Sequence, residues 1–282
     1  MFMTNPFAEL SALIPPDVMQ IYIIVMAVFV AGGTILDMMH KKSAKYFFEN
    51  AQKAKASAKR SVGTVEKAGL AVATVANEVL TSGEFCNVKR RLSHLLTMYG
   101  FIIFAATTTI VIFGWSTDAL VALLWHVGAI MLALGGYWFW FFIRVDVAAE
   151  GVKWYHLVRA DIFIVSLFTT ATFALIWSYL QSKGGAVSDM GLTTLFFALF
   201  IVANTTLFSS VLWSKFAHMF FKPAAAFQKR VTRADGSREN LPADFDLTDP
   251  AVQAKFPDIP QYMGKNPEYM GKGIRREKPS HY

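Results

Sequence analysis

The chain has 282 residues, is 54% hydrophobic and only 17% charged, and has a formal net charge of +7. Because soluble domains carry about a quarter charged residues, this composition predicts an integral membrane protein. The basic residues lie beside the apolar runs, which indicates membrane topology instead of nucleic-acid binding. The only cysteine, Cys86, excludes an internal disulfide, a cysteine-ligated zinc site and a self-contained iron–sulfur cluster.

Five apolar runs are long enough to span the roughly 30 Å of bilayer hydrocarbon. They cover about residues 19–39, 94–114, 119–143, 161–181 and 191–213. Pro15 and Pro16 precede the first run, where neither a basic region nor a small-residue cleavage site is evident, so we expect a retained helix and not a signal peptide. The expected fold is an all-α membrane protein: a bundle of five transmembrane helices with a cytoplasmic helical segment and an extended C-terminal tail.

Lysines and arginines are distributed unevenly among the connections between these runs. Of the 27 basic residues, 11 lie in residues 40–93, 3 in residues 144–160 and 12 after Ser214, and only Lys183 falls on the opposite side. The positive-inside rule then predicts an N-terminus outside the cell and a cytoplasmic C-terminus, in a bacterial or archaeal cytoplasmic membrane. We expect four parts: residues 1–39 with the first transmembrane helix, a cytoplasmic segment at 40–93, a four-helix transmembrane core at 94–221, and a cytoplasmic tail at 222–282.

The two cytoplasmic parts differ in composition. Residues 40–93 are rich in Ala, Lys and Glu, the best helix formers, and predict one or two amphipathic helices at the membrane interface or beneath a partner, or else a solvated helical hairpin. The tail contains seven prolines and no clear period, so it is expected to be extended, either as an arm ordered on a partner or as a disordered end. Its sequence YMGK at residues 262–265 recurs at 269–272, which favours the arm.

Two histidines lie at matching ends of different apolar runs. His94 opens the second run, and His218 lies near the cytoplasmic end of the fifth. If the last helix continues through Lys215 to Phe221, both imidazoles lie at similar depth and are suited to be the two axial ligands of one haem iron. The alternative is that each interfacial histidine only hydrogen-bonds a headgroup or a backbone carbonyl.

Further residues around this pair fit the same hypothesis. Gly100 places a small side chain where a flat macrocycle could approach the second helix. The basic residues suited to neutralising haem propionates are Arg90, Arg91, Lys215 and Lys222.

The remaining histidines give weaker signals. His126 lies within the third run with no other histidine at its depth, so it either hydrogen-bonds a quinone carbonyl or bonds another helix through Asn204, Thr107 or Thr108. His156 precedes the fourth run and is either a reserve haem ligand or a loop residue near the membrane surface.

The stretches RRLSHLLTMYGF, from Arg90, and SKFAHMFFKPAAAFQ, from Ser214, resemble the five-helix cytochrome b membrane subunits. This group includes the nitrate reductase gamma subunit, the membrane subunit of heterodisulfide reductase and those of sulfur-metabolism complexes. The resemblance covers residues 19–228 and implies proximal, cytoplasmic-side haem ligands at His94 and His218. Within the group the chain looks most similar to the membrane anchor of adenylylsulfate reductase.

The sequence departs from the dihaem members of this family. Those members carry a second histidine about three turns deeper in both ligand-bearing helices, whereas the corresponding regions around Phe104 and Phe200 contain none. The resemblance therefore implies one b-type haem or none.

These observations favour a membrane anchor and electron-transfer subunit that links a cytoplasmic iron–sulfur and flavin reductase to the quinone pool. A haem-free structural anchor is the alternative. A small transporter is disfavoured because Asp37 and Arg144 lie at the ends of the runs and no pair of broken helices is evident. The sequence offers no serine–histidine–aspartate set, phosphate loop or metal-spaced cluster, so the chain alone is not expected to be catalytic.

Overall fold

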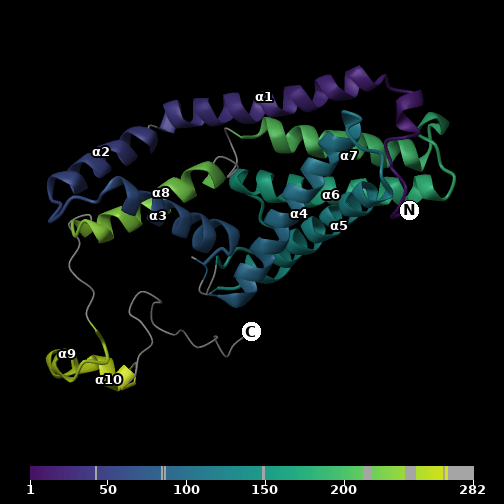
Figure 1. Ribbon diagram of the computed structural model, residues 1–282. Helices are drawn as coiled ribbons and strands as arrows, with labels where there is room; N and C mark the ends of the chain where they lie inside the picture. The colour runs from purple at the N-terminus through teal and green to yellow at the C-terminus, as the bar shows by residue number, and fades with distance from the viewer. Residues whose placement is uncertain are drawn as a thin grey trace. The chain divides into compact units, whose positions relative to one another are not determined.

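The computed structural model describes residues 1–41, 43–83, 85, 87–147, 150–211, 218–238, 246–262 and 264–265 (Figure 1). Within these ranges the chain is helical and contains no strand. It forms two compact units, one of Met1–Tyr46 with Asn77–Ala224 and the other of Phe47–Ala76 with Ala225–Tyr282.

The first unit contains the membrane helices. Among the described residues, five helices are long and apolar enough to cross a membrane, which confirms the all-α membrane fold. These helices are α1 (Pro16–Lys41), α4 (Val88–Ile112), α5 (Ala119–Trp138), α6 (Ile162–Ser182) and α7 (Leu192–Ser209). A π-helical turn, Phe139–Ile143, extends α5.

One helix begins before its apolar run, and one expected helix end is wrong. Helix α4 begins six residues before His94, because the side chain of Asn87 accepts a hydrogen bond from the Arg90 backbone nitrogen at 3.2 Å and caps the first turn. Helix α7 ends at Ser209, so the fifth membrane helix does not continue unbroken to Phe221. A separate helix, α8 (His218–Ala234), follows.

The bundle is built from neighbours along the chain. Helix α4 packs on α5, α5 on α6 and α6 on α7, while α1 packs on α7 and α4 (Figure 1). The fully buried side chains Trp125, Leu132 and Trp177 lie in the core that these helices enclose.

Helices α4 and α5 are in direct backbone contact. A Cβ atom on Gly100 would lie 2.5 Å from the Leu132 nitrogen, and one on Gly128 would lie 2.7 Å from the Phe104 nitrogen. Small residues permit this close approach, which is the usual way in which helices associate inside a bilayer. Gly100 therefore serves α4–α5 packing, and the expectation that a macrocycle approaches α4 at this residue is wrong.

A buried arginine organises the connection between α5 and α6. Arg144, only 1% exposed, pairs with the carboxylate of Asp161, and its guanidinium also donates to the backbone carbonyls of Lys153, at 2.8 Å, and His156, at 2.7 Å. The guanidinium lies 4.2 Å from the centroid of the Trp140 ring, within cation–π range. One side chain thus fixes the path of this loop.

The second unit brings together residues from before α4, Phe47–Ala76, and residues from after α7, Ala225–Tyr282. The expected helices of residues 40–93 are present as α2 (Ser43–Ala56) and α3 (Thr64–Thr74), with a π-helical segment at Val75–Leu80. The backbone nitrogens of Lys59 and Arg60 donate to the Asp235 carbonyl at 2.9 and 3.2 Å, and Arg60 Nε donates to the Ala234 carbonyl at 2.6 Å. The loop between α2 and α3 therefore satisfies carbonyls at the C-terminal end of α8.

The tail is more helical than expected. Helix α8 runs through Pro223, and two short helices follow, α9 (Pro250–Lys255) and α10 (Asp258–Tyr262). The proline removes one backbone hydrogen bond, but the Ala-, Lys- and Arg-rich sequence after it favours a helix. Asp249 caps α9, since its side chain accepts from the Ala251 nitrogen at 2.8 Å. The second YMGK sequence, at 269–272, lies outside the described residues.

Candidate functional site

Three of the residues singled out from the sequence meet at one aromatic ring. The Phe85 cluster consists of Phe85, Arg90, His94 and Lys222. The His94 ring lies 4.9 Å from the Phe85 centroid, the Arg90 guanidinium 5.4 Å from it and the Lys222 ammonium 5.6 Å from it. Lys222, in the first turns of α8, therefore lies at the same ring as Arg90, in the first turn of α4.

A buried serine positions the imidazole of this cluster. His94 Nδ1 and Ser82 Oγ are hydrogen-bonded at 3.0 Å, and Ser82 is only 1% exposed. Where Nδ1 carries the proton and donates it to Ser82, Nε2 keeps its lone pair and is the ring nitrogen suited to a metal. The sequence does not predict the contact between Ser82 and His94, because no motif connects the two residues. The position of Ser82 depends on its left-handed backbone, with φ of 49°.

The other predicted basic residues contribute differently. Arg91 donates from Nε to the Thr81 carbonyl at 2.6 Å and so holds the turn that carries Ser82. Arg90 also forms an ion pair with Glu150 at 3.5 Å. Lys215 and the side chain of His218 lie outside the described residues, although α8 begins at His218.

His126 is completely buried, and both of its ring nitrogens are hydrogen-bonded. Nδ1 lies 2.7 Å from the Ala122 carbonyl and Nε2 lies 2.8 Å from Ser178 Oγ. Because a carbonyl only accepts, Nδ1 carries the proton in the neutral ring and Nε2 accepts from the serine hydroxyl. One of the two alternatives for His126, a bond to another helix, is present, but the partner is Ser178 of α6 and none of the three residues expected from the sequence.

His156 is exposed on the loop between α5 and α6. Its backbone carbonyl accepts a hydrogen bond from Arg144, and its backbone nitrogen donates to the Lys153 carbonyl at 3.0 Å. The backbone of His156 is therefore fixed while its imidazole faces outward.

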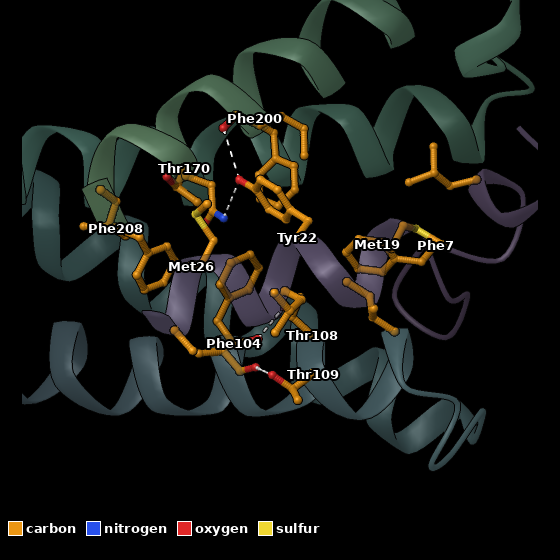
Figure 2. Close-up of a pocket in the computed structure, with 18 of the residues that line it drawn as sticks. Phe7, Met19, Tyr22, Met26, Phe104, Thr108, Thr109, Thr170, Phe200 and Phe208 are labelled. Atoms are coloured by element: carbon orange, nitrogen blue, oxygen red, sulfur yellow. Dashed lines mark hydrogen bonds between the residues drawn. The ribbon is translucent and has the colours of Figure 1, made fainter. Parts of the chain in front are cut away.

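An open pocket of about 430 Å³ is lined mainly by α1, α4 and α7, with Leu132 of α5 and Thr170 of α6 (Figure 2). Phe104 and Phe200, which mark the regions without deeper histidines, both line it, with their ring centroids 6.5 Å apart and their planes at 88°. Tyr22 of α1 donates to Thr205 Oγ1 at 2.9 Å or the Ile201 carbonyl at 3.4 Å, and its hydroxyl accepts from Asn204 Nδ2 at 3.1 Å. No motif in the sequence predicts this pocket, because its lining residues are mostly ordinary apolar side chains on separate helices.

Comparisons with protein-family models, with characterised proteins and with solved structures find no match to this chain. Any assignment of function therefore depends on the residues of the chain and on their arrangement.

Proposed function

We propose that the protein is a membrane anchor and electron-transfer subunit that connects a cytoplasmic iron–sulfur and flavin reductase with the quinone pool through one b-type haem. The observation that carries this proposal is the Phe85 cluster, in which Arg90 and Lys222 of different helices lie at the same aromatic ring as the imidazole of His94. Cations from two helices beside a histidine are the surroundings that a propionate-bearing haem requires.

The residues described at this site fit a haem on chemical grounds. Ligating histidines usually donate their second ring N–H to a nearby acceptor, and Ser82 Oγ offers that acceptor to His94. His94 and His218 would hold the iron, and Arg90 and Lys222 would neutralise the propionates. His218 lies four residues, about one helical turn, before Lys222 in α8. When bound, the haem would supply one-electron transfer, which no side chain of the cluster offers.

The distribution of charge supports a docking side for the reductase. Residues 40–93, 144–160 and those after Ser214 hold nearly all the basic residues, which favours their placement in the cytoplasm. A soluble reductase with an acidic face would dock there, and the resemblance to the adenylylsulfate reductase anchor suggests that enzyme as the partner.

One observation favours the second candidate, a haem-free structural anchor. The Phe85 ring packs 4.9 Å from the His94 ring, and a side chain in this position stabilises the imidazole without any cofactor. In that case Arg90, Lys222 and Phe85 form a cation–π cluster that only joins α4 to α8.

A reduced-minus-oxidised absorption spectrum of the purified protein tests the proposal. We expect a b-type spectrum at no more than one haem per chain, lost in both His94→Ala and His218→Ala. The exposed His156→Ala is the matched control and should keep the spectrum. A featureless spectrum with haem supplied during expression leaves the structural anchor, and two haems per chain contradict the stoichiometry. A bis-histidine spectrum retained in both ligand variants would assign the ligand role to His156.

A further inference from the structure

The loop between α5 and α6 exposes a run of large apolar side chains. Trp154, Tyr155 and Leu157 are 56%, 61% and 65% exposed, and Val158 beside them is 45% exposed. Contiguous apolar patches on a protein surface mark contacts with membranes or with other proteins. We call residues 152–159 the Trp154 loop.

The path of the chain keeps the Trp154 loop at the membrane surface. The loop lies between two segments that are long and apolar enough to span a membrane, Ala119–Ile143 and Arg159–Ser182. The Val152 backbone nitrogen donates to the Arg144 carbonyl at 3.0 Å, so the chain has returned to the end of the first of these segments when the loop begins. The Trp154 loop therefore lies at the level where these two spans end.

Four aromatic rings connect the Trp154 loop with α5. The rings of Tyr137 and Phe141 stack with their centroids 6.2 Å apart. The Trp154 ring lies 6.2 Å from Phe141 and 5.6 Å from Tyr155. Phe141 and its neighbour Phe142 are themselves exposed on the membrane span, so the apolar surface of the loop continues the surface that faces lipid. Since tryptophan and tyrosine are enriched at the level of the lipid headgroups, this continuity favours the bilayer as the partner that covers the loop.

The charges of the Trp154 loop complement anionic headgroups. The loop contains no carboxylate, and its exposed basic side chains are Lys153, His156 and Arg159. The nearest carboxylates on either side, Glu150 and Asp161, are each paired with an arginine outside the loop. The Lys153 ammonium lies 5.7 Å from the centroid of the Tyr155 ring, which places a cation beside an interfacial aromatic side chain. Basic residues in this position attract anionic lipids.

The backbone of the loop is fixed from the inside of the protein. The buried guanidinium of Arg144 donates to the carbonyls of Lys153 and His156, and the His156 nitrogen donates to the Lys153 carbonyl at 3.0 Å. These bonds close the turn that carries Trp154 and Tyr155. Because the turn is already ordered, little backbone entropy is lost when its side chains bind a partner.

We propose that the Trp154 loop is a binding site for anionic phospholipid. Trp154 and Tyr155 insert between the headgroups, and Lys153 and Arg159 pair with the lipid phosphates. This site goes beyond the proposed function and does not depend on the haem, because the loop contains none of the residues of the Phe85 cluster.

Quenching of Trp154 fluorescence by brominated lipids tests the proposal. The full-length protein is placed in nanodiscs of an equimolar mixture of phosphatidylglycerol and phosphatidylcholine. Two samples differ only in which of the two lipids carries bromine on the upper part of its acyl chains. Because the chain contains seven tryptophans, the Trp154 signal is the difference between the wild type and Trp154→Phe. At low ionic strength we expect brominated phosphatidylglycerol to quench this signal about fivefold more strongly than brominated phosphatidylcholine.

Substitutions that remove single charges separate a site in the loop from a general effect of net charge. Lys153→Gln should reduce the preference for phosphatidylglycerol by about half, and the double variant with Arg159→Gln should abolish it. Lys183→Gln is the matched control and should leave the preference unchanged. Lys183 is also exposed and lies 5.7 Å from the centroid of a tyrosine ring, that of Tyr179, but it follows the other end of α6. All variants are compared at equal monodispersity.

Three results would overturn the proposal. The first is a Trp154 signal that neither brominated lipid quenches but that aqueous acrylamide does, which would leave the loop as a surface for a soluble protein. The second is equal quenching by the two brominated lipids, and the third is a preference for phosphatidylglycerol that survives the double substitution. Because the assay uses no haem signal, failure of this proposal and failure of the proposed function are distinguishable.

Discussion

Replacing Arg144 by methionine tests how strongly one buried ion pair holds the loop between α5 and α6. The substitution keeps most of the apolar volume but leaves the carboxylate of Asp161, which is 8% exposed, without its cation. It also removes the donors to the carbonyls of Lys153 and His156. Breaking a buried pair from one side costs about 3–5 kcal/mol, and we expect a loss in the free energy of unfolding of about 4 kcal/mol.

Denaturant titration of the purified protein, followed by circular dichroism, measures this loss. Arg159→Met is the matched control, because Arg159 is exposed on the same loop, and it should change the free energy of unfolding by less than about 0.5 kcal/mol. The double variant with Arg144→Met and Asp161→Leu should regain part of the loss, since no buried charge then stays unpaired. A loss below about 1 kcal/mol for Arg144→Met, or no recovery in the double variant, would refute the reasoning.

Three further outcomes are expected. Hydrogen bonding by Arg60 lowers the pKa of Glu66. The stabilisation of the second unit by this ion pair is therefore complete above the ordinary carboxylate pKa and is lost as the pH falls through the lowered pKa. Glu66→Gln should then flatten the dependence of proteolytic resistance on pH between about pH 5 and pH 3. Gly128→Ala should destabilise the bundle by about 1–3 kcal/mol in the same denaturant titration, whereas Gly32→Ala, with open space around it, should not. In a haem-loaded protein, Ser82→Ala should weaken haem retention by about tenfold in a haem-transfer assay, and unchanged retention would leave Ser82 a purely structural role.

The membrane helices were predictable because a bilayer imposes length and apolarity on a sequence regardless of how the helices pack. The helix ends were not, since they depend on single local contacts, such as the cap that Asn87 places on α4. The sequence did not predict α8, because the prolines of the tail disfavour a helix although the Ala-, Lys- and Arg-rich stretch after Pro223 favours one. Its C-terminal end gains support from a distant loop that no local pattern shows.

The candidate site was predictable in part. The sequence predicted His94 and His218 at similar depth with Arg90 and Lys222 near them, and the structure brings His94, Arg90 and Lys222 to the ring of Phe85. It did not suggest Ser82, whose contribution depends on turn geometry. The partner of His126 was also missed, because Ser178 is one of many small polar residues in the apolar runs and only the rotation of α6 relative to α5 selects it.

The bond between Arg60 Nε and the Ala234 carbonyl imposes an order on biosynthesis. These residues lie 174 positions apart, and the four membrane helices α4 to α7 are translated between them. At about 5–20 residues per second, the ribosome needs roughly 9–35 s to make the intervening chain. During this interval the loop between α2 and α3 exists without the carbonyls to which Lys59 and Arg60 donate, so this contact forms only after the four membrane helices have been synthesised.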